Sequence, residues 1–176
     1  YNVWSFSMRS FPFTTRLLAL ALATVGLLAQ LTGDLRAQTP DDFTPVTDAM
    51  LAQPLADDWP MWRRTLDGWG YSPLDQIDRT NVRTLRMVWT RALHPGSMEG
   101  TPLVYDGVLY MPNSSDAIQA LDAETGDLYW EYIRDLPEDV YEYVGGNARN
   151  NRNIAIYDRF IINTTDDDYA IALDAT

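Results

Sequence analysis

The fold is decided by residues 120–130, which read Ala-Leu-Asp-Ala-Glu-Thr-Gly-Asp-Leu-Tyr-Trp. Short apolar runs that are typical of β-strands, residues 117–122 and 127–132, overlap its two ends. Gly126 permits the positive φ angle of a tight turn, and the preceding carboxylate of Asp122 can accept a hydrogen bond from within that turn. The stretch therefore predicts two short strands that are joined by a tight turn.

Two further apolar runs precede this stretch and are joined by Asp106-Gly107. An Asp-Gly pair between such runs predicts a hairpin, because both central residues of a type I′ turn need positive φ angles. The same order of residues returns 52 positions later, where residues 153–176 align with residues 101–124 without a gap. The identical pairs include Tyr105 and Tyr157, Asp106 and Asp158, Ala120 and Ala172, Leu121 and Leu173, Asp122 and Asp174, and Ala123 and Ala175. The chain therefore contains a repeated unit, unless two unrelated hairpins share similar turns.

A four-stranded unit that repeats about every 40–50 residues is typical of a β-propeller, in which each unit is one blade. A single blade cannot bury both of its faces, so a stable ring needs more blades than this chain holds. Residues 85–92 are predicted to form another strand, because Leu85, Met87 and Trp89 alternate with residues of the opposite face. The predicted fold class is all-β, and the two repeats are expected to be blades of a longer propeller.

The composition narrows the classes of function. The chain has 176 residues, of which 13 are basic, all arginine, and 25 are acidic, so its net charge is −12. Nucleic acid is not an expected partner, because phosphate contacts need a surplus of positive charge on one face. The absence of cysteine excludes a disulfide scaffold, a cysteine-ligated zinc or iron–sulfur site and a cysteine nucleophile.

The N-terminal region has the features of a secretory signal peptide. Residues 1–7 precede the first methionine and are interpreted as translated upstream sequence. Residues 8–37 combine arginines, an uncharged run at 17–29 and a small residue, Ala37, before the expected cleavage point. The apolar run would reach ~20 Å as a helix, which is too short for the ~30 Å bilayer core. We expect a periplasmic protein with no membrane span after cleavage, in which residues 38–57 form a leader segment on the surface with one helical turn.

Residues 120–130 resemble the tryptophan-docking motif of quinoprotein dehydrogenases, which are pyrroloquinoline quinone (PQQ) enzymes with an eight-bladed β-propeller. In that family the tryptophan lies flat between neighbouring blades, and Ala120, Gly126 and Trp130 match the residues of this contact. The wider chain is similar to the family at residues 58–62, 71–77, 99–104 and 152–175. By this resemblance, residues 58–176 are the first two blades of an incomplete PQQ-type propeller domain.

The resemblance implies a cofactor site. Glu99 and Arg152 match family residues that contact the quinone cofactor, and Thr165 matches one that contacts a PQQ carboxylate. Without the resemblance, Glu99 would be a solvated loop carboxylate, Arg152 a surface ion-pair partner and Thr165 an ordinary strand residue. A register slip of one residue would make Thr164 the contact. The catalytic aspartate and the metal ligands of the family are expected beyond Thr176, so no catalytic or metal-binding residue is assigned here.

The resemblance also implies a reaction, the oxidation of a primary alcohol by hydride transfer to PQQ. Ca²⁺ or a lanthanide would act as Lewis acid, and a cytochrome c would accept the electrons. Gly145-Gly146 departs from many members, which carry two adjacent cysteines against the PQQ ring, so a sugar or another alcohol stays open as substrate. Residues 166–168, three aspartates, are expected to form a solvated turn.

A non-enzymatic propeller of the same repeat, acting as an envelope-assembly or interaction scaffold, is the alternative function. Such a scaffold would keep the tryptophan motif but has no reason to keep Glu99, Arg152 and Thr165 together. The chain on its own is expected to be inactive, because the implied catalytic groups lie on later blades.

Overall fold

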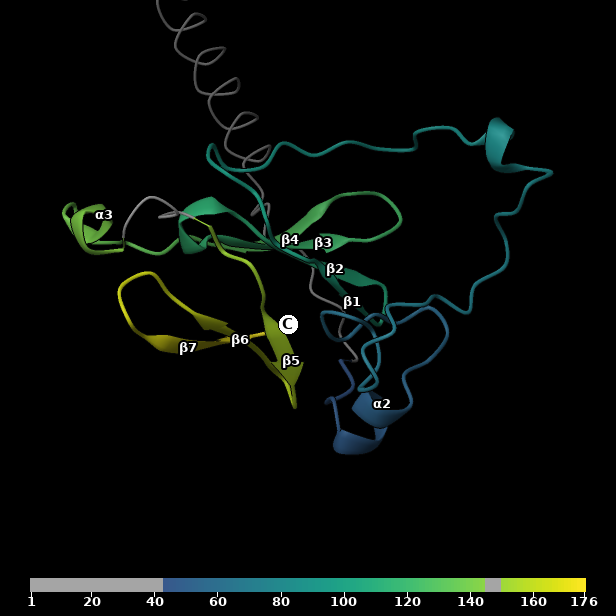
Figure 1. Cartoon of the computed structure of the whole chain (residues 1–176), viewed down its shortest axis with the longest axis horizontal. Helices are drawn as coiled ribbons and strands as arrows, with labels where there is room; N and C mark the ends of the chain where they lie inside the picture. The colour runs from purple at the N-terminus through teal and green to yellow at the C-terminus, as the bar shows by residue number, and fades with distance from the viewer. Residues whose placement is uncertain (1–42, 145–149) are drawn as a thin grey trace, which may run out of the picture. The chain divides into compact units, whose positions relative to one another are not determined.

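The computed structural model describes residues 43–144 and 150–176. The predicted signal peptide (8–37) and the departure at Gly145-Gly146 lie outside these residues. The described strands form a four-stranded sheet, β1–β4, and a three-stranded sheet, β5–β7, in which antiparallel neighbours follow chain order (Figure 1). The helical elements are short: α2 (Asp48–Ala52), η1 (Val82–Thr84), η2 (Ser114–Asp116) and α3 (Val140–Tyr143). The prediction of antiparallel β-structure is confirmed.

The first sheet begins with the predicted hairpin, in which β1 (Leu103–Tyr105) pairs with β2 (Val108–Pro112). The φ angles of Asp106 and Gly107 are 50° and 76°, and these positive values fit the predicted type I′ turn. The predicted strand pair follows as β3 (Ile118–Asp122) and β4 (Leu128–Tyr132).

Asp122 holds the turn between β3 and β4, as the sequence predicts. The backbone N–H groups of Glu124 and Thr125 each donate to Asp122 Oδ1 at 2.8 Å. The Tyr129 hydroxyl donates to Asp122 Oδ2 at 2.7 Å, and this bond, with those from the backbone, lowers the pKa of the Asp122 carboxyl below its ordinary value. Gly126 closes the turn with a φ angle of 78°. The motif therefore specifies its own local geometry.

The second sheet repeats the first three strands of the first sheet. Its members are β5 (Ala155–Tyr157), β6 (Phe160–Thr164) and β7 (Ala170–Asp174). Each strand begins and ends 52 positions after its counterpart in β1, β2 or β3. The cross-strand pairs also fall at equivalent positions in the two sheets. The gapless repeat is therefore confirmed strand by strand.

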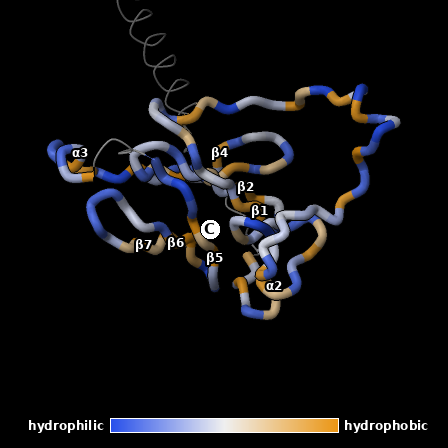
Figure 2. Tube along the Cα trace, viewed as in Figure 1, coloured by the Kyte–Doolittle hydropathy of each residue, from blue (hydrophilic) through white to orange (hydrophobic). Residues whose placement is uncertain are grey.

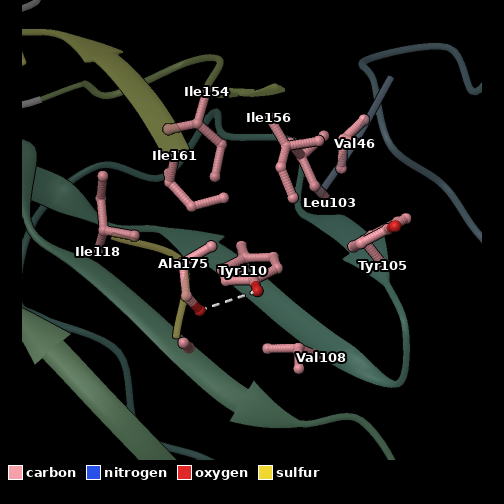
Figure 3. Close-up of a cluster of buried hydrophobic side chains, with 11 residues drawn as sticks. Val46, Leu103, Tyr105, Val108, Tyr110, Ile118, Ile154, Ile156, Ile161 and Ala175 are labelled. Carbon is pink, nitrogen blue, oxygen red and sulfur yellow. Dashed lines mark hydrogen bonds between the residues drawn. The ribbon is translucent and has the colours of Figure 1, made fainter. Parts of the chain in front are cut away.

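The two sheets share one hydrophobic core, which Figure 3 shows in close-up. Its fully or nearly buried side chains include Leu103, Tyr110 and Ile118 of the first sheet and Ile154, Ile156 and Ile161 of the second repeat. The Tyr110 hydroxyl donates to the carbonyl oxygen of Ala175 at 3.1 Å (Figure 3). This hydrogen bond joins β2 to the residue that follows β7.

Most of residues 43–57 lie on the surface, as the sequence predicts, but Val46 enters this core. Val46 is 2% exposed, and its backbone forms an antiparallel bridge with Asp158 through hydrogen bonds of 2.7 and 2.9 Å. The predicted helical turn follows as α2, with the Thr47 hydroxyl accepting from the N–H of Met50 at 3.4 Å. The sequence did not indicate this anchoring contact, because a single valine among polar residues gives no pattern of a buried face.

Two tryptophans make equivalent contacts with the two sheets. The indole N–H of Trp130, on β4, donates to the carbonyl oxygen of Ala175 at 3.2 Å. The indole N–H of Trp89 donates to the carbonyl oxygen of Ala123 at 3.3 Å. Ala123 and Ala175 are equivalent positions of the repeat, so Trp89 contacts the first sheet as Trp130 contacts the second. The motif tryptophan therefore connects successive units, as the family resemblance implies.

The predicted strand over residues 85–92 is wrong. The segment belongs to none of the described strands, because no described neighbour offers it a backbone ladder. Met87 and Val88 are 82% and 84% exposed, so the alternation that suggested a strand has no buried face here. Figure 2 shows further apolar residues at intervals along the long segment without strands that precedes residues 85–92.

Gly126→Ala is expected to destabilise the protein more than Gly107→Ala, although the φ angles of the two glycines are 78° and 76°. A Cβ at position 126 would lie 2.6 Å from Trp89 Cδ2, whereas at position 107 it would meet nothing within 4 Å. Both variants carry the ~1–2 kcal/mol cost of a left-handed alanine, and overpacking adds ~1–3 kcal/mol at position 126. Urea unfolding measures both losses, and equal losses would contradict the Trp89 contact.

Candidate functional site

The residues that lead into β1 and β5 lie side by side. Thr101 and Asn153 form a parallel bridge, and the N–H of Thr101 donates to the carbonyl oxygen of Arg152 at 3.0 Å. Because Thr101 and Asn153 are equivalent positions of the repeat, the bridge joins the same part of two successive units. It brings Glu99 beside Arg152, although 53 positions separate them.

Glu99 and Arg152 form an ion pair at this junction. Arg152 Nε lies 2.8 Å from Glu99 Oε2, and the side chains of Arg152 and Glu99 are 57% and 49% exposed. A pair this exposed contributes only ~0–1 kcal/mol to stability, because water competes for both charges. The pair engages Nε, while the two terminal nitrogens of the guanidinium carry four further N–H donors. The geometry therefore orients the fork of Arg152 more than it stabilises the fold.

Arg152 lines a polar cavity of about 310 Å³, together with residues of η2, of 150–153 and of the turn after β6. Asn151 is 6% exposed, and its Nδ2 amide has no hydrogen-bond partner among the described residues. The side-chain oxygen Oδ1 of Asn150 is also buried and has no hydrogen-bond partner among the described residues. An unsatisfied buried polar group costs ~1–3 kcal/mol, so a ligand that bonds to these amides is favoured.

Asp116 is the most buried acid of this cavity, at 2% exposed. Its carboxylate accepts from the N–H of Asp166 at 2.7 Å and from Asn163 Nδ2 at 3.5 Å. Desolvation raises the pKa of the Asp116 carboxyl above its ordinary value. Ser115 and Asp116 have φ angles of 60° and 56°, and such left-handed residues cost ~1–3 kcal/mol each unless their surroundings hold them. Asp116 therefore combines a strained backbone with a place in the wall of the cavity.

Thr165 lies in the turn after β6 and is 8% exposed. Its hydroxyl donates to Asp167 Oδ1 at 2.5 Å and accepts from the N–H of Tyr169 at 3.2 Å. Thr165 and the exposed Thr164 both line the cavity with Arg152. The structure therefore brings two of the predicted cofactor residues, Arg152 and Thr165, to one cavity, and the third, Glu99, into contact with Arg152.

Residues 166–168 form a turn, as predicted, but Asp167 is only partly solvated because Arg134 pairs with it. Arg134 donates from Nε to Asp167 Oδ1 at 2.8 Å and from Nη2 to Asp167 Oδ2 at 2.6 Å. The side chains of Arg134 and Asp167 are 17% and 13% exposed. These bonds from Arg134 lower the pKa of the Asp167 carboxyl to about 2.

The Arg134–Asp167 pair predicts an acid dependence of stability. Because the folded pKa of Asp167 is about 2 and its ordinary value is 3.8, the contribution of the pair is complete above the ordinary pKa and is lost as the pH falls through the folded value. Asp167→Asn is expected to flatten the loss of unfolding free energy in this acid range, whereas Asp168→Asn, an exposed neighbour, serves as the control. Urea unfolding at several acid pH values measures the slope, and an unchanged slope in Asp167→Asn would refute the pair.

Sequence reasoning missed Asp116, Asn151 and Arg134. Asp116 carries a weak local signal, since a polar Asn-Ser-Ser-Asp segment between two strands suggests a turn, and aspartate tolerates the left-handed region. Arg134 carries no local signal, because its partner is 33 positions away. Asn151 precedes Arg152 in the sequence, but its unpartnered amide depends on the packing around it.

Comparison with known proteins shows the family of the chain. The family model described as "PQQ: Glucose/ethanol/alcohol dehydrogenase, beta-propeller domain" matches residues 59–176. The chain belongs to this family. Among relatives of the PQQ β-propeller family, the alcohol dehydrogenase (quinone), dehydrogenase subunit, of Gluconacetobacter polyoxogenes is 39% identical over 118 residues. That match covers 66% of this chain and 16% of the relative, so the chain spans about a sixth of that subunit's length.

Solved structures of PQQ β-propeller proteins resemble the chain in fold. The quinohemoprotein alcohol dehydrogenase ADHIIG of Pseudomonas putida HK5 superimposes with a TM-score of 0.66 at 32% identity, covering 76% of this chain and 20% of that one. A europium-containing methanol dehydrogenase superimposes with a TM-score of 0.65 at 28% identity. That match covers 72% of this chain and 22% of the dehydrogenase chain. The match to a propeller domain confirms the predicted architecture at the level of the family.

Among the described residues we find neither a group of side chains that could hold a metal ion nor a membrane-spanning helix. Within 43–144 and 150–176, no group of three or more histidine, aspartate or glutamate side chains is placed to hold a metal ion. In that same part of the chain, no helix is long and apolar enough to cross a membrane.

Proposed function

We propose that this chain is part of a periplasmic PQQ-dependent dehydrogenase that oxidises a primary alcohol by hydride transfer to the quinone. The observation that carries the proposal is that Arg152 and Thr165 line one polar cavity and that Glu99 forms an ion pair with Arg152. The resemblance assigns these three residues to PQQ, and Glu99 reaches Arg152 through the bridge that joins the two repeats. The name of the Gluconacetobacter relative, alcohol dehydrogenase (quinone), supports an alcohol as the substrate class.

Several donors of the cavity suit a planar cofactor with three carboxylates and an ortho-quinone, although the carboxylates of Asp116, Asp166 and Asp168 also line it. Arg152 supplies a rigid fork of N–H donors that suits carboxylate and quinone oxygens. Asn151 adds a buried amide donor that has no partner among the described residues. Thr164 adds an exposed hydroxyl beside the one that Thr165 uses within its turn. These groups would hold PQQ on the side of the cavity that Arg152 lines.

PQQ, when bound, supplies a quinone that accepts a hydride, with Ca²⁺ or a lanthanide as Lewis acid. The guanidinium of Arg152 would stabilise negative charge on an oxygen that lies beside its fork. Glu99 accepts from Nε of Arg152 and so restricts the rotation of the guanidinium. The similarity to a methanol dehydrogenase that contains europium supports the lanthanide alternative.

The wider assignments belong to the same proposal. We infer an eight-bladed ring and a cytochrome c as the electron acceptor, both from the resemblance. Export to the periplasm is supported by the arginines and the apolar run of residues 8–37.

The decisive experiment is reconstitution of the full-length enzyme without cofactor. We expect it to reduce an artificial dye with a primary alcohol only after PQQ and either Ca²⁺ or a lanthanide are added. Dye reduction without PQQ would contradict the cofactor assignment. A protein that binds no PQQ would favour the scaffold alternative, and turnover of a sugar but of no alcohol would change the substrate class.

A further inference from the structure

The turn that follows β6 is attached to the preceding repeat at two points. Asp116 of η2 accepts from the N–H of Asp166 at 2.7 Å, across 50 positions of sequence. Arg134, which follows β4, makes its two bonds to Asp167 across 33 positions. The turn that carries Thr165 is therefore held by residues that belong to the first repeat.

Arg134 is itself held in one orientation. Its Nη1 donates to the Tyr132 hydroxyl at 3.4 Å, and its guanidinium carbon lies 4.9 Å from the centroid of the Tyr169 ring. A guanidinium that is bidentate to a carboxylate and stacked on a ring has little freedom to rotate. Arg134 thus constrains the turn from both sides, through Asp167 and through Tyr169.

The pair also decides where the carboxylates of the turn lie. Asp166 and Asp168 line the cavity, whereas Asp167 is not among its lining residues. Asp167 turns instead to Arg134, which compensates its charge, and its Oδ1 accepts the Thr165 hydroxyl at 2.5 Å. Loss of Arg134 would free a carboxylate beside the cavity and would also release the side chain that orients Thr165.

We propose that Arg134 and Asp167 are positioning residues for the cofactor cavity. They hold the turn over residues 164–168 in place and keep one negative charge out of a cavity that receives an anionic cofactor. The inference rests on the proposed function, because it concerns how the same cavity binds PQQ. Neither residue needs to touch the cofactor for this role.

The test measures PQQ binding to the cofactor-free full-length enzyme by tryptophan fluorescence, and amide hydrogen exchange in the same protein. Arg134→Gln is expected to raise the dissociation constant about tenfold or more, because the lost bonds are charge-assisted. Arg134→Lys keeps the charge but loses the fork, so a smaller increase is expected. Exchange should become faster in residues 165–169 and stay unchanged in residues 160–163 of β6.

Arg159→Gln is the matched control, because Arg159 forms an exposed pair with Asp174 at 2.9 Å, and neither residue lines the cavity. It should leave the PQQ constant unchanged. A merely structural role of Arg134 would lower the thermal midpoint and speed exchange throughout β5–β7, without a selective loss of affinity.

Folded Arg134→Gln that binds PQQ as tightly as the unchanged enzyme would overturn the inference. If Arg134→Gln does not fold, the same comparison with Arg134→Lys decides it. If the wild-type enzyme itself binds no PQQ, the proposed function is wrong. This result differs from equal PQQ binding by the wild-type enzyme and Arg134→Gln, which would contradict only the role of Arg134.

Discussion

Arg152→Ala is expected to raise the dissociation constant for PQQ about 10- to 100-fold in the full-length enzyme, because a hydrogen bond to a charged group contributes ~1.5–3 kcal/mol. Its partner Glu99 is 49% exposed, so water can solvate the carboxylate that the substitution leaves behind. The free energy of unfolding should therefore change by less than about 1 kcal/mol. Titration of the cofactor-free enzyme with PQQ measures the constant, and thermal unfolding checks the fold.

Two further variants sharpen this experiment. Arg152→Lys keeps a positive charge but cannot make the planar two-pronged contact, so its PQQ constant should fall between those of alanine and arginine. Arg159→Ala removes an arginine that is half exposed, paired with Asp174 and absent from the cavity lining, so it should bind PQQ normally. Equal PQQ binding by Arg152→Ala and Arg159→Ala would refute the assignment of Arg152 to the cofactor.

Tyr110→Ala is expected to lower the free energy of unfolding by about 3–5 kcal/mol, which is the usual cost of removing a large buried ring. Tyr110 is completely buried between the two sheets, and its ring lies 6.1 Å from that of Trp130, centroid to centroid. Its hydroxyl also reaches the carbonyl oxygen of Ala175 in the second repeat (Figure 3). Urea unfolding of the full-length enzyme measures the loss, and a loss below about 1 kcal/mol would contradict this burial.

A double-mutant cycle separates the hydrogen bond from the packing. The carbonyl oxygen of Ala175 accepts from two donors, the Tyr110 hydroxyl at 3.1 Å and the Trp130 indole N–H at 3.2 Å. Tyr110→Phe or Trp130→Phe alone leaves one donor, whereas the double variant leaves a buried acceptor with neither. We expect the double variant to lose ~1 kcal/mol more than the sum of the single losses. Strict additivity would mean that the two donors do not share this acceptor.

The fold could be predicted wherever the determining interactions are local. The Asp106-Gly107 hairpin and the Asp122 turn follow from residues that need particular φ angles or that bond within a few positions. The repeat then placed β5–β7, because identical residues at a fixed offset make identical strands. Residues 85–92 show where this reasoning fails, since an alternating pattern forms a strand only when a second strand offers it a ladder.

The candidate site could be predicted only in part. Glu99, Arg152 and Thr165 came from a family resemblance, and nothing in their local sequence indicates that Arg152 shares a cavity with Thr165 or pairs with Glu99. Asp116 and Arg134 were missed, because a buried acid or a paired arginine is defined by what surrounds it. Asp167 was misjudged for the same reason, since three consecutive aspartates look solvated until Arg134 is placed beside one of them.

The sequence by itself determined the strands, their turns and the 52-residue repeat, because these depend on φ angles and on hydrogen bonds between near neighbours. Only the tertiary structure decided that Val46 enters the core, that Trp89 and Trp130 link successive units, and that Arg152 shares a cavity with the turn that Arg134 holds. The contacts of Val46, Trp89, Trp130 and Arg134 join residues that are at least 33 positions apart, and they form only when distant segments pack and exclude water between them.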